Sequence, residues 1–223
     1  MMFRAFLFDI DGTLIRSAGA GVKALARAVE PNPAMAGALD GLRLYGMTDR
    51  AICRTLLAAH HEEVTEAAID GLIERYLEAL EASLPAHEGR VVVHAGVHAA
   101  LDALGARGAV IGLATGNVER GARLKLSAVN LWHRFDAARS GFGSDHEDRA
   151  ALVRVGVARC GFAADEVLVI GDTPRDIAAA HAAGAACLAV ATGRYSVEDL
   201  SRAGADETVR TLEAEAALRL FAR

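Results

Sequence analysis

The sequence predicts an α/β fold, in which a doubly wound, Rossmann-like parallel sheet carries an inserted all-helical segment. Five short apolar runs bounded by turn residues have the character of buried strands, and helical patterns alternate with them. Strands that alternate with helices form a parallel sheet covered on both faces. The insertion is predicted because no strand-like run interrupts the helical periodicity between about residues 17 and 85.

The predicted strands lack polar alternation, as expected for strands that are buried on both faces of a sheet. They are Ala5–Phe8, Ala109–Ala114, Phe135–Arg139, Val167–Ile170 and Ala186–Val190, of which the third has the weakest pattern. Core helices are expected at Val97–Leu104, Arg149–Cys160 and Arg175–Ala183.

The inserted segment has helical periodicity over three stretches, with a break at Pro31-Asn32-Pro33. The stretches are Val22–Val29, Arg50–His60 and Ala67–Leu84. We therefore expect residues 1–16 and 86–223 to form a discontinuous core and residues 17–85 to form a helical domain.

The composition is typical of a globular protein, with 52% hydrophobic and 24% charged residues. The formal net charge of −5 gives no electrostatic reason to bind nucleic acid or an anionic membrane. No apolar run is long enough to cross a bilayer, and charge breaks the N-terminal run too early for a signal peptide, so a cytoplasmic location is expected. Cys53, Cys160 and Cys187 are widely spaced, which predicts buried free thiols.

Three of the predicted strands end in residues that suggest chemistry. These motifs are Asp9-Ile10-Asp11-Gly12-Thr13, Thr115-Gly116-Asn117 and Gly171-Asp172-Thr173-Pro174-Arg175-Asp176. Open parallel sheets bind ligands beyond the carboxyl ends of their strands. Each motif alone also fits ordinary turn and helix-cap residues. Three together at one sheet edge, two of them with paired carboxylates, predict an active site.

The clustered carboxylates predict a divalent cation, because it compensates their mutual repulsion. An all-oxygen ligand set suits Mg²⁺, and Asp9 and Asp172 are expected to bind it directly. A carboxylate can also attack phosphorus and form an aspartyl-phosphate, with the cation offsetting the repulsion between the two anions. We assign the nucleophilic role to Asp9.

The remaining polar residues at the strand ends suit the other steps of phosphoryl transfer. Asp11 lies beside Gly12, which permits a sharp bend, so Asp11 is expected to protonate the departing oxygen and then deprotonate water. The Thr115 hydroxyl and the amides of Gly116 and Asn117 lie at a strand-to-helix turn, where such donors bind phosphoryl oxygens.

A phosphate site also needs a fixed positive charge, for which Arg149 and Lys125 compete. Arg149 opens a predicted helix within an ordinary charged stretch, and Lys125 fits an ordinary helix face. From its sequence context alone, Arg149 fits a surface arginine slightly better, and the family resemblance described below is what favours Arg149 as the phosphate-binding residue. Asp176, one helical turn after Asp172, and Thr173 are expected in an outer layer that orients the metal waters or the basic residue.

The order of these motifs resembles the haloacid dehalogenase superfamily over nearly the whole chain, and most closely its phosphoglycolate-phosphatase-like group with a helical cap. The resemblance implies a five-stranded sheet in the order 5-4-1-2-3 and Asp9 and Asp11 as nucleophile and general acid/base. It also implies Thr115 as a phosphate binder and Mg²⁺ bound by Asp9, Asp172 and the backbone carbonyl of Asp11. One departure is arginine at position 149, where the family usually has lysine.

The segment Leu44–Arg50 is expected to form a cap loop near the site. Within it, Arg50 would either meet a second anionic group of the substrate or simply follow a helix N-cap at Thr48 or Asp49.

The leading prediction is a magnesium-dependent phosphatase acting on a small phosphorylated metabolite, of phosphoglycolate or sugar phosphate type, as a monomer or homodimer. A β-phosphoglucomutase-like phosphomutase would share Asp9 and Asp11 and stays an alternative. A non-catalytic phospho-acceptor domain fits less well, because its phosphorylated aspartate follows a later strand. Asp11 also disfavours dehalogenation, in which no acid has to protonate the halide.

Overall fold

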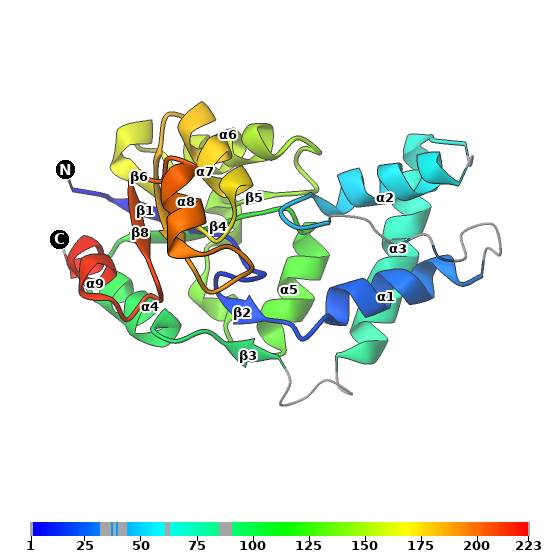
Figure 1. Ribbon diagram of the computed structural model, residues 1–223, viewed down its shortest axis with the longest axis horizontal. Helices are drawn as coiled ribbons and strands as arrows, with labels where there is room; N and C mark the ends of the chain where they lie inside the picture. Colours follow the sequence, from blue (N-terminus) through cyan, green and yellow to red (C-terminus); the bar gives the residue numbers. More distant parts are fainter. Residues whose placement is uncertain are drawn as a thin grey trace.

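The computed structural model describes residues 2–31, 37, 39, 44–60, 63–84 and 91–222. The strands are β1 Ala5–Phe8, β2 Ile15–Arg16, β3 Val92–Val93, β4 Val110–Thr115, β5 Gly141–Phe142, β6 Val167–Gly171, β7 Ala186–Val190 and β8 Glu207–Val209. The helices are α1 Ala20–Val29, α2 Asp49–Ala59, α3 Glu66–Ser83, α4 Val97–Ala106, α5 Glu119–Ser127, α6 Arg149–Cys160, α7 Pro174–Ala182, α8 Val197–Arg202 and α9 Glu215–Ala222 (Figure 1).

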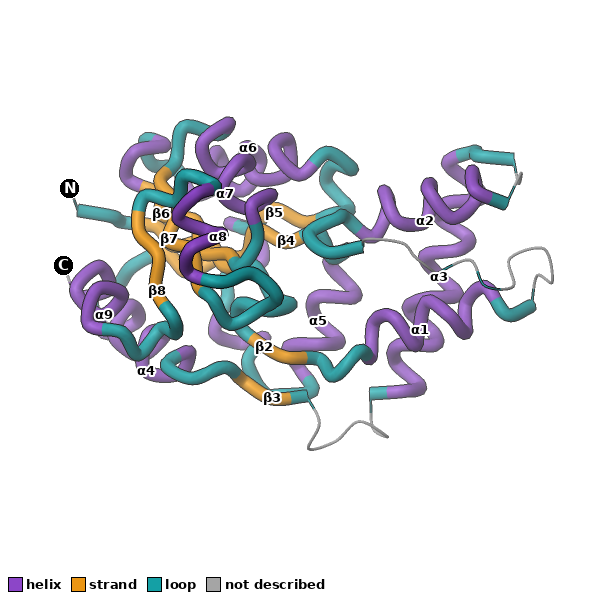
Figure 2. The backbone as a smooth tube through the Cα atoms, viewed as in Figure 1, coloured by secondary structure: helices purple, strands orange, loops and turns teal. Residues whose placement is uncertain are grey.

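The main sheet is parallel and covered by helices on both faces, which confirms the predicted fold class (Figure 2). Alternate residues of β1 pack against the helices on opposite faces of the sheet, because successive side chains of a strand point to opposite faces. Phe6 and Phe8 pack in one hydrophobic cluster with α4, α5 and α9. Ala5 and Leu7 pack in another cluster with α6, α7 and α8.

The sheet has six strands in the order β5-β4-β1-β6-β7-β8. This is the expected order of five strands, extended by β8, which pairs in parallel with β7 at the edge. Sequence reasoning missed β8 because its three residues, Glu207–Val209, include two polar side chains.

The predicted strand at Phe135–Arg139 is wrong. Ala137–Arg139 forms a 3₁₀ turn, whose first residues are capped by the Asp136 carboxylate accepting from the Ala138 amide at 3.0 Å. The strand beside β4 is instead Gly141–Phe142. Glycine adds nothing to an apolar pattern, so the sequence did not reveal this strand. A glycine is nevertheless required at position 141, because a Cβ there would lie 2.2 Å from a carbonyl oxygen of α6.

The regular elements in the described part of the inserted segment are the helices α1, α2 and α3, which pack around a hydrophobic cluster of their own. They lie together at one end of the molecule (Figure 1). The antiparallel pair β2–β3 joins Ile15 to Val93 and Arg16 to Val92, where the chain leaves and re-enters the sheet region. The division into a core of 1–16 and 86–223 and a cap of 17–85 stays a prediction, and its second boundary and most of the Pro31–Pro33 break lie outside the described residues.

Two expectations about the whole chain can be compared with the described residues. Cys53, Cys160 and Cys187 are buried free thiols, as predicted. In this part of the chain, no helix combines the length and the apolar character that a membrane span requires.

Candidate active site

A cavity of about 490 Å³ lies at the carboxyl ends of β1, β4 and β6. Asp9, Asp11 and Asp172 line it from the sheet side, and residues of α1, α2 and α3 line it from the other side. The structure therefore brings together the three strand-end motifs that the sequence singled out.

Three buried carboxylates form the first part of the site. Asp9, Asp172 and Asp176 have oxygen atoms within 4.8 Å of one another. The Asp9 amide donates to the Ile170 carbonyl at 2.8 Å, which holds Asp9 beside the end of β6. Gly12 must be glycine here, because its φ is +89° and a Cβ would lie 2.3 Å from Asp172 Oδ2.

The charge of this cluster is not balanced by the protein. Burial raises the pKa of Asp9 to about 6, while Arg149, whose Nη2 lies 3.1 Å from Asp9 Oδ1, acts in the opposite direction. Burial, together with the charges of Asp176 and Asp9, raises the pKa of Asp172 well above its ordinary value. Three carboxylates facing one guanidinium leave two negative charges uncompensated. An all-oxygen donor set with this charge fits a divalent cation such as Mg²⁺.

Asp176 differs from the other two carboxylates because both of its oxygens already have partners. Oδ1 accepts from Arg149, including Nε at 2.8 Å, and Oδ2 accepts from the Thr173 amide at 3.0 Å and hydroxyl at 2.7 Å. Asp176 does not line the cavity, whereas Asp9 and Asp172 do. This placement suits the outer role predicted for Asp176 and Thr173, which stays a prediction.

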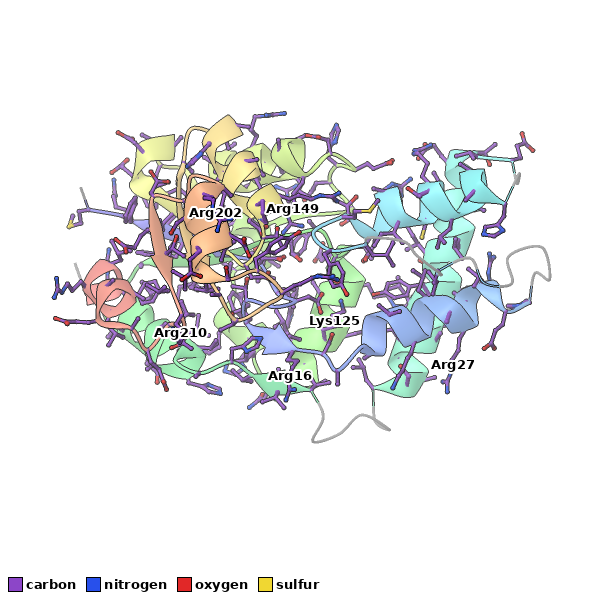
Figure 3. The ribbon with its side chains drawn as sticks, viewed as in Figure 1. Arg16, Arg27, Lys125, Arg149, Arg202 and Arg210 are labelled. Carbon is purple, nitrogen blue, oxygen red and sulfur yellow. The ribbon has the colours of Figure 1, made fainter. Side chains whose placement is uncertain are left out.

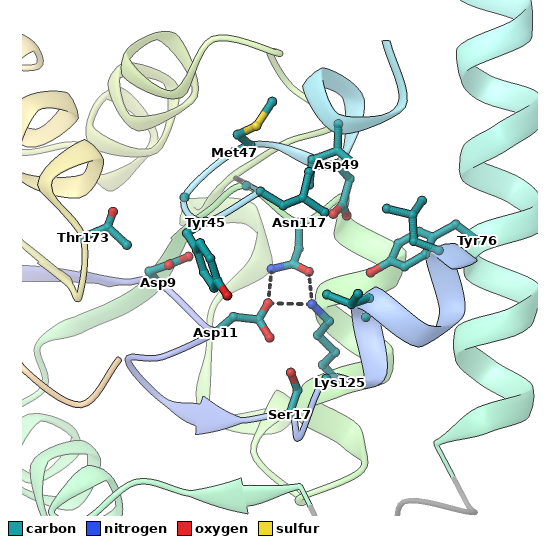
Figure 4. Close-up of a pocket in the computed structure, with 18 of the residues that line it drawn as sticks. Asp9, Asp11, Ser17, Tyr45, Met47, Asp49, Tyr76, Asn117, Lys125 and Thr173 are labelled. Atoms are coloured by element: carbon teal, nitrogen blue, oxygen red, sulfur yellow. Dashed lines mark hydrogen bonds and ion pairs between the residues drawn. The ribbon is translucent and has the colours of Figure 1, made fainter. Parts of the chain in front are cut away.

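Asp11 belongs to a second cluster, in which it is joined to Lys125 and Asn117 (Figure 4). Lys125 Nζ lies 2.5 Å from Asp11 Oδ2 and donates to Asn117 Oδ1 at 2.6 Å. Asn117 Nδ2 donates to the same Asp11 oxygen at 3.0 Å. Burial opposes ionisation of Asp11, but the Lys125 charge and these hydrogen bonds outweigh it and lower the pKa of Asp11.

The second motif is split between the cavity and its support. Gly116 and Asn117 line the cavity. Thr115 is fully buried and is not among the lining residues, and its hydroxyl accepts from Asn117 Nδ2 at 2.9 Å. Thr115 therefore holds Asn117 in this structure, and its own predicted contact with phosphate stays a prediction.

The two candidate cations, which are labelled in Figure 3, pair with different carboxylates. Arg149 contacts Asp9 and Asp176, whereas Lys125 contacts Asp11. Sequence reasoning selected Arg149 and treated Lys125 as a rival, and so missed the part that Lys125 plays beside Asp11. One signal was present, since Lys125 is one of two lysines among 24 basic residues.

Comparison with known proteins assigns the family. A family model described as haloacid dehalogenase-like hydrolase matches residues 6–190. The chain is a haloacid dehalogenase-like hydrolase. It is 29% identical over 213 residues to a phosphoglycolate phosphatase of Rhodospirillum rubrum, covering 92% of this chain and 86% of the relative. This confirms the predicted family and the predicted enzyme class, a hydrolase of the phosphatase type.

Solved structures share the fold of this haloacid dehalogenase-like hydrolase. A predicted phosphatase from Clostridium acetobutylicum has a TM-score of 0.75 at 20% identity, over 99% of both chains. A putative β-phosphoglucomutase from Thermotoga maritima has a TM-score of 0.65 at 21% identity, over 98% of this chain and 99% of the other. Phosphatases and a mutase thus share one architecture, so the architecture alone does not choose between them.

The loop before α2 brings the helical segment of this hydrolase onto the site. The Asp49 amide donates to the Gly116 carbonyl at 2.8 Å, and the Asp49 carboxylate accepts from the Val118 amide at 2.9 Å. Thr48 caps α2 and donates to the Glu147 carbonyl at 2.8 Å. Asp49 lines the cavity together with Leu44, Tyr45, Gly46 and Met47, so this segment lies near the site as expected. For Asp49 itself, sequence reasoning had considered no role other than a helix cap.

Arg50 does not face the substrate cavity. Its guanidinium pairs with Glu66 and Asp70 of α3, and it is absent from the cavity lining. Of the two interpretations of this segment, the helix start is therefore confirmed, with Thr48 as the N-cap.

Proposed function

We propose that this hydrolase is a magnesium-dependent phosphatase that releases phosphate from a small phosphorylated metabolite through an aspartyl-phosphate on Asp9. One observation carries the proposal. Asp9 lines the cavity at the end of β1, beside both Arg149 and the Asp172 carboxylate, and Asp11 lines the same cavity two residues later.

Asp9, Asp172 and the backbone carbonyl of Asp11 would hold Mg²⁺. When bound, the ion would offset the repulsion between the Asp9 carboxylate and the substrate phosphate. The unbalanced charge of the three buried carboxylates and their all-oxygen chemistry support this assignment.

The residues of the chain account for the remaining steps. Arg149 and the amides of Gly116 and Asn117 would hold the phosphoryl oxygens in place. An Asp9 oxygen would attack phosphorus as the bond to the leaving oxygen breaks. Asp11 would first take up a proton from solvent and would then donate it to that oxygen. Asp11 would then take a proton from water as the water attacks phosphorus, which releases inorganic phosphate and restores Asp9.

The arrangement around Asp11 fixes the position of its carboxylate. Lys125 and Asn117 both bind Oδ2, so the orientation of the carboxylate is set before substrate arrives. Lys125 is itself only 4% exposed, so solvent does little to weaken its charge at this position.

The proposal is tested by phosphate release from p-nitrophenyl phosphate and from a panel of phosphorylated metabolites, with Mg²⁺ and with EDTA. We expect sustained turnover that EDTA abolishes, and a phosphoenzyme trapped by acid quench. Asp9→Asn keeps the shape of the side chain but is a far weaker nucleophile, so it should lower kcat at least 10³-fold and remove the phosphoenzyme. Activity of Asp9→Asn within a few-fold of the parent would refute the role of Asp9.

The mutase alternative makes a different prediction in the same assay. A phosphomutase would convert glucose 1-phosphate to glucose 6-phosphate and release little inorganic phosphate. Sustained phosphate release without that conversion would exclude it.

A further inference from the structure

The cavity wall formed by the helical segment is mainly apolar, in contrast to the acidic wall formed by the strand ends. Apolar side chains from α1, α2 and the loop between them line it: Val22, Leu25, Leu39, Leu44 and Ile52. Cys53 also lines this wall, and burial raises the pKa of its thiol to about 12, so it presents a neutral surface. The phosphate end of the cavity lies at the strand ends, so this wall faces the rest of the substrate.

Among the described lining residues, both cations are already paired. Arg149 contacts Asp9 and Asp176. Lys125 lies between Asp11 and Asn117. The charge that the helical segment itself contributes to the described lining is the carboxylate of Asp49, on the same side as Lys125.

We propose that this cavity selects phosphate monoesters whose leaving alcohol is uncharged and carries a hydrocarbon group, and that it discriminates against a leaving group with a carboxylate, such as glycolate. The inference rests on the proposed phosphatase function and names the substrate class of that same site. It departs from the substrate named for the phosphoglycolate phosphatase relatives.

The physical reason is the balance of hydration and charge at the apolar wall. A carboxylate placed there would lose water without gaining an unpaired cation from the described lining residues, and it would approach the negative charge of Asp49. A methylene group placed there would instead gain binding, by roughly fourfold for each methylene that becomes buried. The Tyr76 hydroxyl also lines the cavity and is a neutral partner for a polar atom of an uncharged alcohol.

The test compares esters that differ in one feature. Phosphoglycolate and phosphoglycolamide have the same size and differ in a carboxylate against a carboxamide. We expect kcat/KM to be at least tenfold higher for the amide, and to rise by roughly fourfold per methylene from ethyl to butyl phosphate. Equal or faster hydrolysis of phosphoglycolate would overturn the inference while leaving the phosphatase function standing. If the protein hydrolysed neither these esters nor p-nitrophenyl phosphate, both this inference and the proposed phosphatase function would be overturned.

Two variants address the charge directly. Asp49→Asn removes a negative charge but keeps an acceptor for the Val118 amide, so it should narrow the preference for the amide several-fold. Asp102→Asn, on the exposed surface of α4, is the matched control and should leave the preference unchanged. Ile52→Lys places a cation on the apolar wall and should raise kcat/KM for phosphoglycolate relative to the amide. An unchanged ratio in both Asp49→Asn and Ile52→Lys would contradict the inference.

Discussion

The two carboxylates of the first motif lie two residues apart, yet their surroundings differ in a way that explains the site. Asp9 lies close to the carboxylates of Asp172 and Asp176, and the Arg149 guanidinium is the cation beside this group. Asp11 is paired with Lys125 and hydrogen-bonded to Asn117, so its charge is balanced within the protein. One half of the site is complete as folded, and the other lacks positive charge.

The difference indicates where a ligand is needed. Buried carboxylates without compensating charge destabilise the folded state, and a bound cation removes that cost. The Asp11 half needs no ligand, because its partners are delivered by the β4–α5 turn and by α5 itself. The half that would bind the cation is therefore the less stable one.

The largest expected effect separates the two cations. Arg149→Ala removes the guanidinium beside Asp9, so it should weaken inhibition by inorganic phosphate and lower kcat/KM, each by about 10²-fold. Lys125→Ala should leave phosphate inhibition within a few-fold of the parent, because Lys125 contacts Asp11, and lower kcat about tenfold instead.

Inhibition constants and steady-state kinetics measured on both variants provide the comparison. Arg149→Lys is the conservative variant, and it should recover part of the phosphate affinity if charge dominates over the bidentate geometry. Loss of phosphate inhibition in Lys125→Ala alone would show that the assignment of Arg149 is wrong.

A smaller effect is expected on stability. Burial and the neighbouring charges raise the pKa of Asp172, so its ionised form destabilises the fold near neutral pH. Without Mg²⁺, Asp172→Asn should therefore melt a few degrees higher than the parent. With millimolar Mg²⁺ the parent should gain several degrees and the variant should not, so that the order of the two melting temperatures is reversed.

Thermal unfolding followed by circular dichroism at pH 7, with EDTA or Mg²⁺, measures both effects. Asp102→Asn serves as the control and should follow the parent in both conditions. An equal Mg²⁺ response in the parent and Asp172→Asn would remove Asp172 from the proposed ligands.

The smallest effect concerns Asp49, at the junction of the helical segment and the sheet. Burial raises the pKa of Asp49 to about 6, against the favourable charge of Lys125. A raised carboxyl pKa stabilises the fold at low pH, and this contribution is lost as the pH rises through about 6. Relative to the parent, Asp49→Asn should therefore gain about 1 kcal/mol of unfolding free energy between pH 5.5 and 7.5.

Urea unfolding of both proteins across this pH range isolates the contribution of Asp49, because the other carboxylates are common to both. A difference that stays constant with pH would show that Asp49 titrates normally in the folded protein.

Local patterns in the sequence were sufficient for the class of fold and for the strand-end residues. Uninterrupted apolar runs identify buried parallel strands, and parallel strands place their carboxyl ends at one edge, so Asp9, Asp172 and Asn117 were predictable as neighbours. The pattern failed where no apolar run exists. Gly141–Phe142 is a strand because Gly141 lets α6 pack directly on its backbone, which is a tertiary requirement.

Only the tertiary structure decided which charges are paired. Lys125 is 114 residues from Asp11, and no local pattern predicts that a helix-face lysine is buried against that carboxylate. The character of the cavity wall is decided in the same way, because α1, α2 and α3 must pack before it is known which side chains remain facing the sheet. Composition and spacing determine what each segment can form, whereas charge balance and cavity lining depend on contacts between segments that are distant in the chain.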